Sequence, residues 1–257
     1  MCCFSARVEH VSATKIFVRA EGPRQLVVYE MSLVAQGELA MVLPIPIALG
    51  ASEDAVEMVD LSQVPTFFTQ LGVIFDSQRL SFAAPSRLAP QSKALKVHQV
   101  GAFEASFVPR AIDFDRLDPR FAIPSSVWAG VPAVAGFGFV VFKLRETEPP
   151  GLVDRVLGRA AASERTYHPM AFWFPRRDTT RLFLPTLHIH DGSVHETADF
   201  DHVLYAQASI DPPGWESSNV SLQQSAWGEL KRYVADAPGQ RATIKGTLPN
   251  KDTWIAA

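Results

Sequence analysis

Four of the seven histidines of this 257-residue chain fall within one stretch, LPTLHIHDGSVHETADFDH, which runs from Leu184 to His202. A single residue, Ile189, separates His188 from His190, and His195 follows soon after an Asp-Gly pair. Imidazole nitrogens are common ligands of first-row transition metals, with zinc–nitrogen distances of about 2.0–2.1 Å. Whether these rings could share one ion depends on the element that carries them.

The Asp191-Gly192 pair predicts a β-hairpin, because a two-residue turn between strands favours residues that accept positive φ. With this pair as the turn, His188 lies across from His195, with Cβ atoms roughly 5 Å apart. His190 shares the face of His188, since side chains along a strand alternate with a period of two. We therefore predict a three-histidine metal centre formed by His188, His190 and His195.

Three further side chains could complete this centre. His202 is an alternative ligand if the following strand bends back, and Cys2 and Cys3 would add thiolates if the amino terminus folds over the site. Thiolates favour copper or zinc, whereas three histidines with an open fourth position suit zinc and an activated water. The expected cofactor is therefore a zinc or copper ion. The same histidine pattern also fits a polar strand edge without any ligand.

The two cysteines also allow an enzymatic alternative. Cys2 and Cys3 are the only cysteines and are adjacent, so they cannot cross-link distant parts of the fold. Removal of Met1 would make Cys2 an amino-terminal nucleophile whose own amine serves as base. With Arg19 ending the next strand, residues 1–20 superficially resemble the cysteine-type amidohydrolases of that class, which makes Cys2 and Cys3 the catalytic candidates. The aspartate expected shortly after the arginine is missing.

A third interpretation is a non-catalytic binding or scaffold protein whose histidines are incidental. Lys and Arg number 24 and Asp and Glu 27, giving a net charge of −3, and no basic run indicates nucleic-acid binding. No apolar stretch approaches the roughly 20 residues that cross a bilayer, and the start lacks a secretory signal. We therefore expect a cytoplasmic protein with a small-molecule or peptide substrate if it is an enzyme. Nothing in the sequence fixes the oligomeric state.

Short β-branched and aromatic runs separated by turn residues dominate the chain. The predicted strands are 3–10, 13–19, 25–34, 39–47, 94–108, 137–144, 170–175, 200–208 and 241–248, with helices from about Ser62, over 152–162 and from Ser221. Pro44 and Pro46 cannot donate to a strand ladder, so we expect their segment to lie at a sheet edge or to leave the sheet there. This pattern predicts a β-dominated α+β fold with mostly antiparallel sheets and two or three packed helices.

We expect residues 1–257 to form a single β-rich domain. The segments LVVYEMSLVAQGELAMVLPIPI and FVVFKL followed by HPMAFWFPRR resemble each other faintly, which points to pseudo-repeat halves 1–110 and 111–257, or two similar β layers. In the closing loop, Asn250 and Asp252 are expected to form a turn.

The chain resembles a bacterial protein family of uncharacterised function. The resemblance is carried by the segments MCCFS, LPIP, FEASFVPR, HPMAFWFPRRDTT and PTLHIHDGSVH, and it implies no activity.

Overall fold

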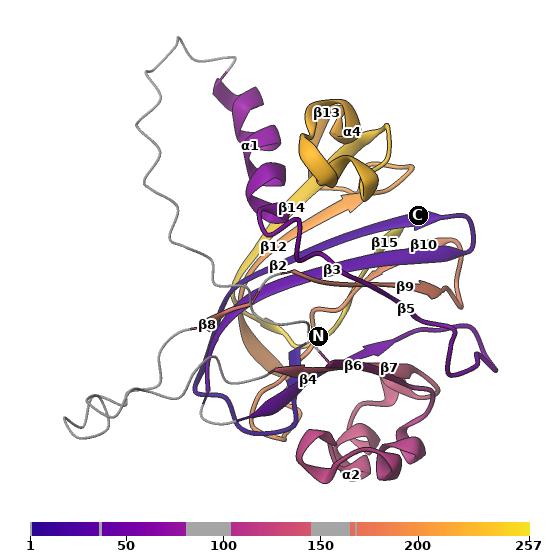
Figure 1. The fold of residues 1–257 in the computed structure, drawn as a ribbon. Helices are drawn as coiled ribbons and strands as arrows, with labels where there is room; N and C mark the ends of the chain where they lie inside the picture. The colour runs from indigo at the N-terminus through magenta and orange to yellow at the C-terminus, as the bar shows by residue number, and fades with distance from the viewer. Residues whose placement is uncertain (1, 36–37, 81–103, 145–164, 168) are drawn as a thin grey trace.

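The computed structural model describes residues 2–35, 38–80, 104–144, 165–167 and 169–257. These residues form an eight-stranded sheet, a five-stranded sheet and a two-stranded sheet, with a few short helices at their faces (Figure 1). Most of the described strand pairs are antiparallel, and β1 with β11 and β12 with β2 are parallel. The predicted β-dominated α+β fold is therefore confirmed.

The large sheet is built around a long hairpin of β2 and β3. Its strands, in spatial order, are β13 (Glu216–Ser221), β14 (Pro238–Pro249), β12 (Thr197–Gln207), β2 (His10–Glu21), β3 (Arg24–Val34), β9 (Met170–Pro175) and β5 (Glu57–Val59), with β8 (Arg165–Thr166) paired to β3. Gly22 turns between β2 and β3 with a φ of 55°. Nearly every residue of β3 is buried, which is expected of a strand covered on both faces.

The smaller sheets include the amino terminus and the histidine region. The five-stranded sheet has the order β11 (His188–Ile189), β1 (Cys2–Phe4), β4 (Leu39–Ile45), β7 (Gly138–Leu144) and β6 (Glu104–Val108), and β10 (Arg181–Leu184) pairs with β15 (Thr253–Ala256). β4 lies between β1 and β7, so the prediction that Pro44 lies at a sheet edge is wrong, and Pro44 pairs with Phe139 of β7. The chain does leave the strand at Pro46, because β4 ends at Ile45.

Two hydrophobic cores follow from the period of two along β2 and β3. Ile16, Val18 and Val27 face the five-stranded sheet, whereas Phe17 and Val28 face the helices. Figure 1 shows α1 and α4 on one side of the large sheet, and β4, β6, β7 and α2 on the other. The large sheet is therefore the shared wall between two cores.

The helix predicted from about Ser62 begins later, at Phe67, and the helix predicted from Ser221 is shorter than its pattern predicts. The α-helices are α1 (Phe67–Leu80), α2 (Ser125–Ala129) and α4 (Leu222–Ser225), and the 3-10 helices are η1 (Ala111–Arg116), η2 (Pro119–Phe121), η3 (Pro132–Val134) and η4 (Gly228–Arg232). Ser221 does cap α4, since its Oγ accepts the Gln224 N–H at 3.2 Å. The predicted long helix is interrupted, because Ala226 and Trp227 have extended backbone conformations before η4 begins at Gly228.

The predicted helix over 152–162 lies outside the described residues, as does most of the predicted strand over 94–108. Among the helices of the described ranges, none combines the length and the apolar character needed to cross a membrane.

Gly138 is the position where β7 tolerates no side chain. A Cβ there would lie 2.6 Å from Cε2 and 2.7 Å from Cζ of the Phe107 ring, and 3.1 Å from Cγ2 of Ile47. We expect Gly138→Ala to lower the free energy of unfolding by about 1–3 kcal/mol in urea denaturation, because β6 must move to admit the methyl group. Gly72→Ala, in α1, is the control: its nearest neighbour would be the Tyr205 hydroxyl at 3.9 Å, and helix propensity favours alanine by up to about 1 kcal/mol. Equal stability of the two variants would contradict this packing.

Candidate functional site

The predicted hairpin around Asp191-Gly192 is wrong. β11 ends at Ile189 and pairs in parallel with β1, with Cys2 beside His188, and the next strand, β12, belongs to the large sheet. The Asp-Gly pair does form a turn, because Gly192 has a φ of 80° and Asp191 Oδ1 accepts the Ser193 N–H at 3.0 Å. The chain uses this turn to leave one sheet for another, so no cross-strand pair joins His188 and His195.

His195 is therefore separate from the other two predicted ligands. Its ring is exposed, and its Nε2 lies 3.0 Å from Asp191 Oδ2. This pair closes the turn locally, and in the exposed setting it contributes only about 0–1 kcal/mol.

His188 and His190 do come together, but with His202 in place of His195. We call His190, His188 and His202 the histidine stack. The His188 ring lies between the other two, with centroid distances of 4.7 Å to His190 and 4.8 Å to His202 and interplanar angles of 21° and 28°. The Nε2 atoms of His188 and His202 are 2.9 Å apart, which is hydrogen-bond distance. His202, predicted as the alternative ligand, thus takes the place expected for His195.

The stack joins two sheets. His188 lies in β11 of the five-stranded sheet, and His202 lies in β12 of the large sheet. Phe200, two residues before His202 and therefore on the same face of β12, contacts the His188 ring at a centroid distance of 4.6 Å. Phe4 of β1 packs against His190 at 5.7 Å. Aromatic rings therefore pack against all three imidazoles; His188 and His202 are buried, and His190 is partly exposed.

Burial keeps these histidines neutral. Loss of hydration, followed by repulsion from His202 and His190, lowers the pKa of His188 to about 2, and burial lowers that of His190 to about 4. Burial also lowers the pKa of His202, although hydrogen bonding to Asp201 opposes the shift. Neutral imidazoles are the form that binds metal ions.

Two buried ring nitrogens are poorly satisfied. His202 Nδ1 has no well-formed hydrogen bond among the described residues; it lies 3.5 Å from Asp201 Oδ1, while Asp201 Oδ2 accepts the Ala13 N–H at 2.6 Å. The buried Nε2 of His190 has no hydrogen-bond partner among the described residues. A buried polar atom without a partner needs a physical explanation, such as a bound water or ion.

Two side chains of the β14–β15 loop hold β11 in place, and we call Asn250 and Asp252 the tether. Asp252 Oδ1 accepts the N–H groups of Thr186 and Leu187, each at 3.0 Å. Asn250 Oδ1 accepts the His188 N–H at 2.7 Å, and its Nδ2 donates to the His188 carbonyl at 2.9 Å. The tether satisfies the outer edge of β11 as a neighbouring strand would. Sequence reasoning assigned these residues only to a turn.

The backbone of the two cysteines pairs with β11, the strand that carries His188 of the histidine stack. Cys2 pairs with His188, and Cys3 pairs with Ile189 on one side and Val42 on the other. Cys3 is fully buried within the core between the eight-stranded and the five-stranded sheet. The side chain of Cys2 lies outside what the structure describes, so its roles as ligand and as nucleophile stay predictions. In the described part of the chain, no three His, Cys, Asp or Glu side chains are already arranged to hold a metal ion.

The buried imidazoles should make the protein sensitive to acid. Their pKa values are lowered in the folded state from an unfolded value of about 6.5, so the unfolded chain binds more protons below that pH. Their stabilising contribution is therefore complete above about pH 6.5 and is lost as the pH falls towards the folded values. In metal-free protein, going from about pH 7 to pH 5 should lower the free energy of unfolding by on the order of 2 kcal/mol through His188, and His190 and His202 act in the same direction.

The measurement is urea denaturation at both pH values for the wild type and His188→Leu, which removes one buried imidazole. The variant should lose less stability on acidification than the wild type, by about the contribution of one histidine. His195→Gln, which removes an exposed imidazole, should behave as the wild type. An identical pH dependence in His188→Leu and the wild type would contradict the burial of a neutral His188.

The chain matches no protein-family model and no curated protein. The solved structure of baculovirus P35 resembles it, with a TM-score of 0.55 and 10% sequence identity over 99% of this chain and 99% of that chain. At this identity the likeness concerns the arrangement of strands and helices and transfers no residue's role. The comparison therefore establishes that this chain has a fold similar to that of baculovirus P35.

Proposed function

We propose that this protein binds a transition metal ion, zinc or copper, through the imidazoles of the histidine stack. The observation that carries the proposal is the 2.9 Å approach of His188 Nε2 to His202 Nε2 between two buried rings. Two tetrahedral ligands with metal–nitrogen bonds near 2.05 Å have their nitrogens about 3.3 Å apart. The N–N distance therefore needs to change by only a few tenths of an ångström, although both rings must also turn so that two lone pairs converge, and the shared hydrogen must leave Nε2.

His190 is the third ligand in this proposal. Its Nε2 is buried and lacks a hydrogen-bond partner among the described residues, and its ring stacks on that of His188 at 4.7 Å. Since no three-ligand set is yet arranged in the described residues, binding requires the His190 ring to turn about its side-chain torsions. Metal binding would give the buried Nε2 of His190 a partner, which is energetically favourable.

Asp201 supports the proposal from behind His202. Metal-binding histidines usually donate their second nitrogen to a carboxylate or carbonyl, which fixes the ring and raises its basicity. Asp201 Oδ1 lies 3.5 Å from His202 Nδ1, while the Nε2 of the same ring faces His188. Glu196 and Asp199, which are exposed, have no comparable contact with the stack.

A fourth ligand could come from the amino terminus. The register that pairs Cys2 with His188 supports Cys2 as a thiolate donor, and we keep Cys3, beside Ile189, as the weaker candidate. When bound, zinc would supply Lewis acidity and copper a redox centre. The residues described here would hold the ion, exclude water with Phe4 and Phe200, and keep His202 oriented through Asp201.

Metal content tests the proposal directly. Untagged protein, stripped with chelator, reloaded with zinc or copper and dialysed, should contain about one ion per chain by elemental analysis. His188→Gln and His202→Gln should lose that ion, whereas His195→Gln should retain it, because only the first two belong to the stack. Thermal melting of each metal-free variant separates loss of ligand from loss of fold. Substoichiometric metal in a folded wild type would exclude the proposal.

The carboxylate of Asp201 leads to a prediction about metal affinity. Asp201→Asn removes the negative charge behind His202 while keeping an acceptor for the Ala13 N–H. We expect the metal affinity to fall about 10–100-fold in a competition titration against a chelator. Asp199→Asn, on the same strand, is the matched control and should leave the affinity unchanged. A wild-type affinity in Asp201→Asn would remove Asp201 from the site.

A further inference from the structure

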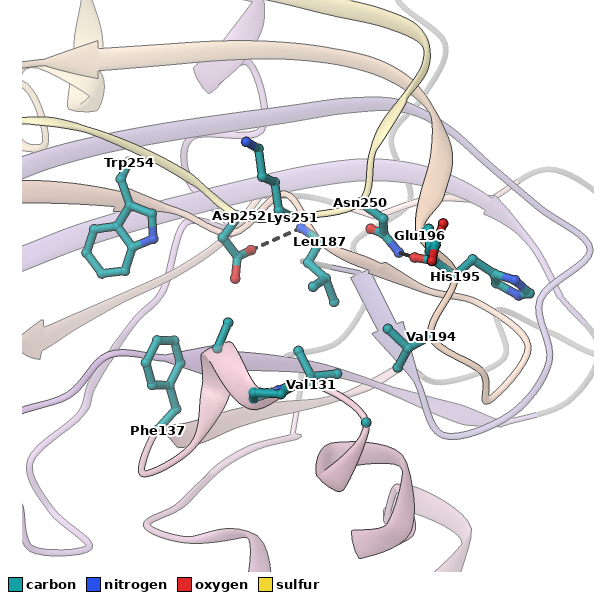
Figure 2. A pocket seen from close by; sticks show the side chains of 13 residues that line it. Val131, Phe137, Leu187, Val194, His195, Glu196, Asn250, Lys251, Asp252 and Trp254 are labelled. Atoms are coloured by element: carbon teal, nitrogen blue, oxygen red, sulfur yellow. Dashed lines mark hydrogen bonds between the residues drawn. The ribbon is translucent and has the colours of Figure 1, made fainter.

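A cavity of about 540 Å³ is lined by both residues of the tether, Asn250 and Asp252, and by none of the three histidines of the stack. It is bounded by the segment from Gly130 to Phe137 below, and by Leu187, His195 and the β14–β15 loop above (Figure 2). Ligand sites in proteins commonly have volumes of about 300–1,000 Å³, mostly apolar walls and a few placed polar groups. This cavity has that size and that composition.

The walls are largely apolar. Val131, Phe137, Leu187, Val194 and Trp254 line the cavity with aliphatic and aromatic surface. Trp254 is held in place because Phe183 packs against one part of its ring at a centroid distance of 4.9 Å. A ligand that fills this space therefore has an apolar body.

Asp252 supplies the polar group at the centre. Both of its backbone hydrogen bonds, from Thr186 and Leu187, end on Oδ1, so the side chain is fixed. Figure 2 shows its other carboxylate oxygen directed into the cavity. Burial raises the pKa of Asp252, and the charge of the amino terminus opposes that shift. A cation placed against the oxygen that faces the cavity would stabilise the ionised carboxylate.

The neighbouring basic groups do not supply that cation. The Lys251 side chain points away from the cavity in Figure 2. Arg181 stacks on the Trp254 ring at 4.6 Å and pairs with Asp178 at 2.7 Å. Glu196 adds a second acidic side chain to the lining. The cavity is thus an apolar space with an acidic centre, and in the described part of the chain no Lys or Arg side chain pairs with Asp252.

We propose that this cavity binds a small organic amine, with its ammonium group on Asp252 Oδ2 and its apolar body against Val131, Phe137 and Trp254. The site is independent of the metal proposal, although the tether residue Asn250 borders both. An ammonium–carboxylate hydrogen bond in such a setting is stronger than a bond between neutral groups, so the amine should bind more tightly than a neutral analogue of the same shape.

The test is a calorimetric titration of chelator-treated protein with phenethylammonium, 2-phenylethanol and 3-phenylpropanoate. We expect phenethylammonium to bind about tenfold or more tightly than 2-phenylethanol, and the carboxylate not to bind. Asp252→Asn should abolish this preference, since the asparagine keeps an Oδ1 for the Thr186 and Leu187 N–H groups and replaces only the oxygen that faces the cavity. Asp54→Asn, an exposed carboxylate outside the lining, is the charge control and should bind as the wild type.

A second variant keeps the result interpretable if Asp252→Asn is unstable. Ala133 is exposed and lines the cavity, so Ala133→Trp should fill it without disturbing the core and should abolish binding of both the amine and the alcohol. Equal affinities of amine and alcohol for the wild type, or no binding of either, would overturn the proposal. Because the protein is metal-free throughout, these outcomes are independent of whether the histidine stack binds an ion.

Discussion

The hydrogen bonds from the tether to β11 are the constraint on which both sites depend. β11 is only His188–Ile189 and has a single strand partner, β1. A strand this short gains little from one neighbour, and its outer N–H and C=O groups would be costly if left unpaired. Asn250 satisfies that edge at both the N–H and the carbonyl of His188, and Asp252 accepts the N–H groups of Thr186 and Leu187 just before the strand. The loop between β14 and β15 therefore takes the place of a neighbouring strand. It fixes the positions of the His188 ring and of the cavity wall.

This arrangement explains why one side of β11 is apolar and sealed while the other opens on a cavity. His188 points towards β12 and contacts Phe200 and His202, so the two sheets meet through aromatic and imidazole rings. The preceding residue, Leu187, lines the cavity because successive side chains alternate between faces. Asp252 serves both sides, since one oxygen holds the backbone and the other faces the cavity. A change in the loop would thus move both features together.

Local patterns predicted much of the fold, and nonlocal pairings were beyond them. Met170–Pro175 is a strand with the predicted bounds, because its apolar run is enough to define it. The Asp-Gly signal predicted a turn, which exists, but not that the chain would change sheets after it. The parallel pairing of Cys2 with His188 has no local signature, since nothing in either segment specifies the other. Asn250 and Asp252 resemble turn residues because the same side chains that bond their own loop can bond a distant strand.

The proton in the His188–His202 bond links the stack to its proposed ion. If Asp201 holds a hydrogen on His202 Nδ1, then His202 Nε2 is the acceptor and His188 Nε2 carries the shared hydrogen. An ion between the two rings requires that hydrogen to move to His188 Nδ1, a tautomer change that releases no proton. Because burial keeps both imidazoles neutral near pH 7, histidine ligands displace no protons on binding. A thiol that joins them as thiolate does release one, so the proton count distinguishes a site of histidines alone from one that includes Cys2.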